Sequence, residues 1–103
     1  LKHVNFDVNK NITNACLIKL VDKCPNLYKI ELFKNRVDEG FLEYVHKLDR
    51  PFHIMFSSCN INFEKFLKDK EILSKKTVPY VDDFENDLYT IGKLKLETSD
   101  DIN

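Results

Sequence analysis

The stretch CPNLYKIELFKNRVDEGFL, residues 24–42, predicts one short β-strand, a turn and the start of a helix. Its anchors follow the spacing Leu27-x-x-Ile30-x-Leu32-x-x-Asn35. Side chains two positions apart point to the same face of a strand, so Ile30 and Leu32 are expected to face a core. The first part of this stretch therefore predicts a strand with one buried face.

The same offsets recur before and after this stretch. The earlier copy is Leu1, Val4, Phe6 and Asn9, and the later copy is Pro51, Ile54, Phe56 and Cys59. Asn35 lies 26 residues after Asn9 and 24 residues before Cys59. Both spacings fall within the 20–29 residues typical of leucine-rich repeats, which place Asn or Cys at the turn.

The segments 11–17 (NITNACL) and 37–42 (VDEGFL) resemble the "ITDxGL" start of the cysteine-containing subtype of this repeat. Cys24-Pro25-Asn26-Leu27 resembles its "CPNL" junction. The resemblance covers residues 1–60 and is typical of F-box leucine-rich proteins, the substrate receptors of cullin ubiquitin ligases, and of other eukaryotic scaffolds. It implies an α/β solenoid with parallel short strands on the concave face and helices on the convex face.

Residue patterns place the remaining elements. Helices are expected over 13–24, 39–48 and 63–74, capped by Thr13, Asp38 and Asn62, whose side-chain oxygens can accept from backbone N–H groups. Strands are expected over 1–9, 27–33 and 52–57, then around Val78 and Tyr80, and over 91–99, with a link at 84–90. We expect one domain over 1–103: regular repeats over 1–60, and degenerate repeats or a cap over 61–103.

The residues between the anchors should form three rows across the concave face, because strand side chains alternate and neighbouring strands lie roughly 4.8 Å apart. The rows are His3, Lys29, His53, Thr77, Lys93; Asn5, Glu31, Met55, Pro79, Lys95; and Asp7, Phe33, Ser57, Val81, Glu97. The centre mixes apolar and charged groups, as protein-binding surfaces do. The candidate partner-binding residues are Lys29, Glu31, Phe33, His53, Met55 and Ser57. The alternative is that Phe33 and Met55 are ordinary exposed apolar residues.

Composition excludes several classes of function. A net charge of −1, with acids beside each basic cluster, argues against nucleic-acid binding. No apolar run reaches the length of a membrane span, so membrane insertion is not expected. The cysteines at 16, 24 and 59 fall on repeat positions and are expected to be buried thiols rather than disulfides.

No arrangement of catalytic or metal-binding residues stands out, so we expect no enzyme activity, cofactor or metal. His3 and His53 share a row but lie two strands apart, roughly 10 Å, too far to share a zinc ion. His46 is expected on the polar face of a helix. Asp82-Asp83 and Asp100-Asp101 read as turn residues rather than convergent carboxylates. Two glycines are too few for a phosphate-binding loop.

The resemblance implies a protein-interaction module, most readily the substrate-recognition repeats of an F-box-type ubiquitin ligase receptor. The chain begins with Leu rather than Met, so we expect a piece of a longer protein. An F-box that contacts a Skp-type adaptor would then lie upstream, in a cytoplasmic or nuclear protein. The alternative is a non-catalytic scaffold or assembly subunit of a large complex, for example mitochondrial, because similar repeats resemble those of an ATP synthase coupling-factor subunit.

Overall fold

A computed structural model describes residues 2–7, 11–71, 75–80 and 83–99. Its elements are β1 (His3–Asp7), α1 (Asn14–Lys23), β2 (Lys29–Phe33), α2 (Glu39–Leu48), β3 (Phe52–Ser57), α3 (Phe63–Asp69), β4 (Lys75–Pro79), β5 (Glu85–Ile91) and β6 (Leu94–Thr98). The predicted anchors Leu1 and Asn9 and the predicted row member Val81 lie outside the described residues.

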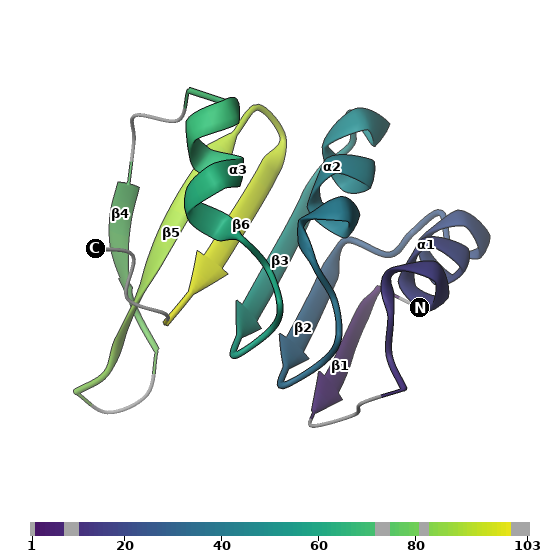
Figure 1. The fold of residues 1–103 in the computed structure, drawn as a ribbon, viewed down its shortest axis with the longest axis horizontal. Coiled ribbons are helices and arrows are strands. Elements are labelled where there is room, and N and C mark those ends of the chain that lie inside the picture. Colours follow the sequence, from purple (N-terminus) through teal and green to yellow (C-terminus); the bar gives the residue numbers. More distant parts are fainter. Residues whose placement is uncertain (1, 8–10, 72–74, 81–82, 100–103) are drawn as a thin grey trace.

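The six strands form one mixed sheet in the order β1-β2-β3-β6-β5-β4 (Figure 1). β1, β2, β3 and β6 run parallel, whereas β5 is antiparallel to both β4 and β6. The prediction of a leucine-rich-repeat solenoid is therefore wrong. In a solenoid each new strand adds beside the preceding one, but here the place beside β3 is taken by β6, the last strand that the structure describes.

The β5–β6 hairpin causes this departure. Ile91 pairs with Leu94 across the two-residue turn Gly92-Lys93, and Gly92 has φ +56°, a conformation that glycine adopts without steric cost. The predicted link at 84–90 is instead most of β5. α3 carries the chain from β3 to the edge strand β4, and two antiparallel reversals, β4 to β5 and β5 to β6, bring β6 back beside β3 and parallel to it.

Over the first three strands, the register agrees with the predicted rows. His3 lies beside Lys29, and Lys29 beside His53, with matching pairs along the rest of each strand. The rows fail after β3, because Lys95 pairs with His53 and Glu97 with Met55. Each is two residues from its predicted row.

The helix starts are set mainly by side-chain caps. Asp38 accepts a hydrogen bond from the Gly40 N–H (2.9 Å), and Asn62 accepts one from the Lys65 N–H (3.2 Å), as predicted. Thr13 occupies the N-cap position of α1, but its side chain makes no capping hydrogen bond. α3 ends at Asp69, earlier than predicted.

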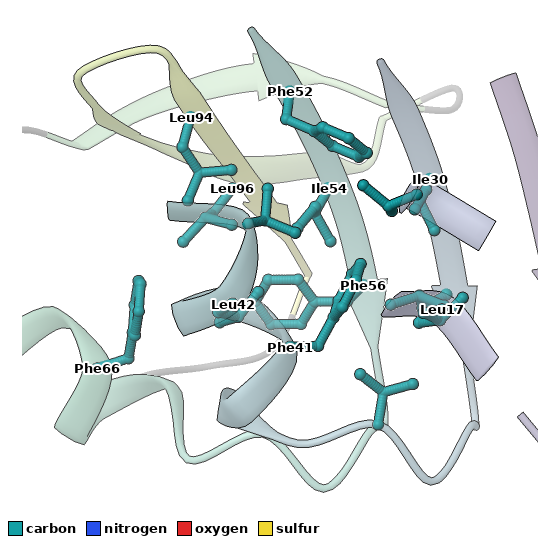
Figure 2. Close-up of a cluster of buried hydrophobic side chains, with 14 of the residues drawn as sticks. Leu17, Ile30, Phe41, Leu42, Phe52, Ile54, Phe56, Phe66, Leu94 and Leu96 are labelled. Atoms are coloured by element: carbon teal, nitrogen blue, oxygen red, sulfur yellow. The ribbon is translucent and has the colours of Figure 1, made fainter. Parts of the chain in front are cut away.

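The core lies between the sheet and the three helices, which lie along one side of it (Figures 1 and 2). Alternate residues of β2, β3 and β6 are buried on that side, and Figure 2 shows them packed against helix residues such as Phe41 and Leu42. Phe63 of α3 meets Phe56 of β3 and Tyr89 of β5 edge-on, with ring centroids 5.0 and 4.9 Å apart. These aromatic contacts fix α3 over both the parallel and the antiparallel part of the sheet.

The prediction of buried cysteines is wrong. Cys16 is exposed, Cys24 and Cys59 are half-buried, and none of the three forms a disulfide within the described structure. Hydrogen bonding with Thr13 is the largest cause of a lowered pKa at the Cys16 thiol.

Candidate functional site

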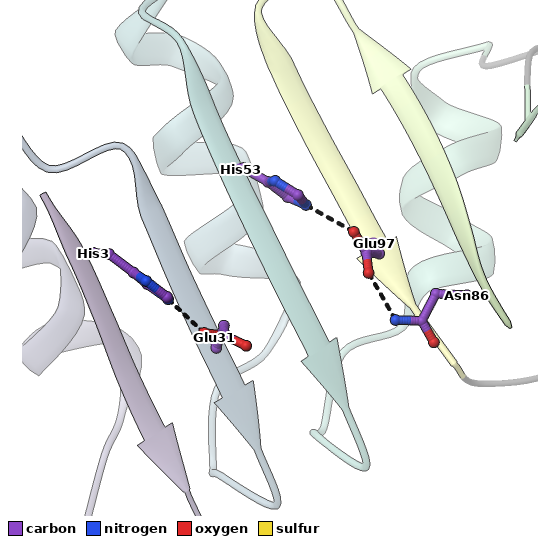
Figure 3. A network of polar contacts seen from close by, with 5 residues as sticks. All are labelled: His3, Glu31, His53, Asn86 and Glu97. Atoms are coloured by element: carbon purple, nitrogen blue, oxygen red, sulfur yellow. Dashed lines mark hydrogen bonds and ion pairs between the residues drawn. The ribbon is translucent and has the colours of Figure 1, made fainter. Parts of the chain in front are cut away.

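The face of the sheet opposite the helices carries the candidate site. Figure 3 views the sheet from this side, with the helices behind it. We define the open face by the outward residues of four strands: His3 and Asn5 of β1; Lys29, Glu31 and Phe33 of β2; His53, Met55 and Ser57 of β3; and Lys95 and Glu97 of β6.

All six predicted partner-binding residues lie together on this face. They form three lateral pairs, because Lys29 lies beside His53, Glu31 beside Met55 and Phe33 beside Ser57. Phe33 is exposed, with 39% of its surface accessible, and the other five are partly buried. The structure thus brings the predicted residues onto two neighbouring strands, and their role in binding stays a prediction.

Two histidine–glutamate pairs cross the strands of the open face (Figure 3). His3 contacts Glu31 through Nε2 and Oε2, and His53 Nε2 lies 3.1 Å from Glu97 Oε1. In both pairs the histidine lies beside a lysine, and the glutamate follows that lysine by two residues. The same diagonal geometry therefore occurs twice on this face, between β1 and β2 and between β3 and β6.

The second pair extends into a buried polar chain. Glu97 also accepts a hydrogen bond from Asn86 through Oε2 and Nδ2, 2.7 Å apart. Glu97 and Asn86 are only 6% and 4% exposed, although both are polar. Burying a polar group without a hydrogen-bond partner costs free energy, so the linked hydrogen bonds of His53, Glu97 and Asn86 help to define how β3, β6 and β5 align.

His53 is neutral near pH 7. Burial is the main cause that lowers the pKa of His53 below its usual value, and the charge of Lys29 adds to this, whereas the nearby Glu97 carboxylate acts in the opposite direction. The 3.1 Å contact has the geometry of an ion pair, but the net lowering means that a neutral ring donates its Nε2–H to the carboxylate.

A pocket of about 310 Å³ opens at the end of the open face where the parallel strands finish. Its lining residues are Asn5, Glu31, Leu32, Phe33, Met55, Phe56, Ser57, Tyr80, Asn86 and Ser99. Tyr80 follows the edge strand β4, and Asn86 belongs to β5, so the antiparallel strands complete the pocket. Its volume is near the lower limit of about 300–1,000 Å³ for ligand sites.

Sequence reasoning missed Asn86, Tyr80, Ser99 and the position of Glu97. A signal for Glu97 exists, since Lys95-Leu96-Glu97 repeats the pattern Lys29-Ile30-Glu31. Aligning these two tripeptides gives the observed register beside β3. Asn86 and Tyr80 reach the site only through the antiparallel pairing, for which the repeat pattern carries no signal.

The described residues contain no group of His, Cys, Asp or Glu side chains placed to hold a metal ion. Nor does any helix in the described ranges have the length and apolar character needed to cross a membrane. Comparisons with protein-family models, curated proteins and solved structures find no match for this chain.

Proposed function

We propose that this chain is a protein-binding module that uses the open face of its sheet. The observation that carries the proposal is the cluster of Phe33, Met55 and Tyr80 around one pocket, bordered by Glu31 and Ser57. Phe33 and Tyr80 are 39% and 54% exposed, which is unusual for large apolar side chains that lie together. Apolar anchors with polar groups around them are characteristic of protein interfaces.

The finer role that we propose is substrate recognition for an F-box-type ubiquitin ligase. Its support is the resemblance of segments 11–17, 24–27 and 37–42, which does not depend on a complete solenoid. A non-catalytic scaffold in a large, for example mitochondrial, complex is the second candidate. The mixed sheet favours it, because β6 and the β5–β6 hairpin occupy the place where further parallel strands would add.

Paired variants test the binding face. The double variant Glu31→Lys/Phe33→Ala should lose most of the partner protein recovered by affinity capture and quantitative mass spectrometry. The matched control is Glu64→Lys/Tyr28→Ala, because Glu64 is exposed on α3 and Tyr28, 49% exposed, lies outside the pocket.

The control should retain the partner at the level of the unmodified chain. Equal recovery by both folded double variants would overturn the proposal. Recovery of a cullin with a Skp-type adaptor would support the ligase role, and a fixed set of organelle subunits would support the scaffold.

A further inference from the structure

The two edges of the described sheet differ in how well they can accept a further strand (Figure 1). β4 forms one edge and carries Lys75, Lys76 and Pro79, all of them exposed. Lysine and proline are common on edge strands, because a charge or a missing N–H prevents pairing with another strand. β1 forms the other edge, and its sequence HVNFD contains neither residue type. The β1 edge is therefore the one open to a further strand.

Backbone groups of β1 point toward this open edge. The Lys2 carbonyl accepts hydrogen bonds from the N–H groups of Tyr28 and Lys29, on the β2 side, at 3.0 and 3.2 Å. Successive residues of a strand direct their N–H and C=O groups to opposite sides, so those of His3 and Asn5 point away from β2. No described strand lies beyond β1. These donors and acceptors are thus placed to pair with an added strand.

The apolar side chains of β1 are also incompletely covered. Val4 and Phe6 lie beside Ile30 and Leu32 of β2 and share their face of the sheet. Ile30 and Leu32 are only 0% and 2% exposed, whereas Val4 and Phe6 are half-buried. The difference arises because β2 has a strand on each side and β1 has a described neighbour on one side only. A strand added at β1 would bury this apolar surface.

We infer that β1 pairs antiparallel with β1 of a second copy of this chain, about a two-fold axis at Asn5. This register uses the whole strand, because position 3 then lies opposite position 7 and Val4 lies opposite Phe6. Val4 and Phe6 form apolar cross-strand pairs on the helix side, and such pairs stabilise a sheet. The outward backbone groups of Asn5 exchange hydrogen bonds with those of Asn5 in the other copy. The strand is thus complementary to itself.

The dimer would join two open faces into one surface. Paired residues of neighbouring strands point to the same face of a sheet, so both open faces lie on the same side of the joined sheet. Asn5 lines the pocket of its own copy, so each pocket borders the junction between the copies. A two-fold contact is closed, and the exposed lysines and proline of β4 oppose further growth. This inference goes beyond the proposed function and does not depend on it.

Sedimentation equilibrium of the full chain tests the dimer. The mass should approach twice the 12.2 kDa of one chain and fall on dilution. Asn5→Lys places two lysines opposite each other at the axis, so the affinity between copies should fall about tenfold. Its fold should persist, because Asn5 is exposed and lies beside Glu31. Thr77→Lys is the matched control: Thr77 is exposed on the β4 edge, and its variant should dimerise like the unmodified chain.

Nuclear magnetic resonance on a mixture of isotope-labelled and unlabelled chains tests the register. A nuclear Overhauser effect between the α-protons of Val4 in one copy and Phe6 in the other is expected, because such non-hydrogen-bonded pairs have Cα atoms about 4.5 Å apart. Within one copy these residues are two positions apart along a strand, roughly 7 Å, so the signal must come from contact between copies.

Three results would overturn the inference. A chain that stays monomeric at about 1 mM would leave the β1 edge to an extended segment of another protein. A dimer that Asn5→Lys leaves unchanged, or that Thr77→Lys weakens equally, would show that the copies meet through another surface. A dimer without the effect between Val4 and Phe6 would contradict the two-fold register. Partner capture tests the open face separately, so none of these results decides the proposed function.

Discussion

His53 and Glu97 join β3 to β6 through a hydrogen bond of 3.1 Å between Nε2 and Oε1. This contact lies between β3 and β6, at the position where the repeat pattern predicted the strand around Val78 and Tyr80. It recurs in the same diagonal geometry between His3 and Glu31 at the other end of the parallel strands. The same kind of histidine–glutamate contact on the open face therefore joins β1 to β2 and β3 to β6.

Stability should fall in mild acid because of His53. Burial lowers the pKa of His53 in the folded chain below its unfolded value of about 6.5, so folding disfavours the protonated ring. The stability that neutral His53 contributes is fully present above about pH 6.5, and it is lost as the pH falls through the pKa of His53 in the folded chain. Thermal unfolding followed by circular dichroism should show a lower melting temperature at about pH 5 than at about pH 7.5.

The variant His53→Gln isolates this contribution, because glutamine can donate to Glu97 but does not titrate. Its melting temperature should depend less on pH over the same interval. His46→Gln, which changes a histidine of α2 that contacts neither Glu97 nor Asn86, should keep the pH dependence of the unmodified chain. An identical pH dependence in the His53 variant would show that another group causes the effect.

Arg50→Lys should destabilise the fold. The Arg50 guanidinium donates to the carbonyls of Val21 and Leu27 at 3.4 Å, near the C-terminal end of α1, and its Cζ lies 5.4 Å from the centroid of the Phe52 ring. Lysine cannot span these acceptors, so urea unfolding should give a loss of about 1–3 kcal/mol. Arg36→Lys, at an exposed position, should change stability by less than about 0.5 kcal/mol. Equal losses of stability in the Arg50→Lys and Arg36→Lys variants would contradict a stabilising role for Arg50.

Gly92→Ala should destabilise the β5–β6 hairpin. Space is not the cause, because an added Cβ would meet nothing within 4 Å. The cause is the φ of +56°, where a residue with a Cβ loses about 1–2 kcal/mol. Gly92→Asn should lose less, because asparagine visits this region more readily. Urea unfolding of the two variants measures the difference, and an alanine variant as stable as glycine would contradict the backbone argument.

The sequence predicted the local features of the first three strands. The anchor offsets around Leu32 and Phe56 gave their register, and Asp38 and Asn62 gave two helix starts, because these depend on short-range periodicity and capping. The open-face position of Lys29, Glu31, Phe33, His53, Met55 and Ser57 followed from the same alternation.

The overall topology could not be predicted in this way. Whether β6 or a new repeat strand lies beside β3 depends on long-range pairing, which the anchor pattern does not encode. Two local signals pointed to the outcome: Gly92 marks a tight hairpin, and Pro79 suits only an edge strand. Because residues 84–90 were predicted to be a link, Asn86 was not predicted to lie at the site, and Glu97 was predicted one row away from its observed position.

The most direct test of the proposed binding face is site-specific photo-crosslinking in cells. A photoreactive residue is placed at Met55, in the centre of the open face, and separately at Lys47, which is exposed on α2. The proposal predicts one discrete crosslinked partner from position 55, lost when Glu31→Lys/Phe33→Ala is added, and none of that partner from position 47. A partner captured from position 47 and not from position 55 would contradict it.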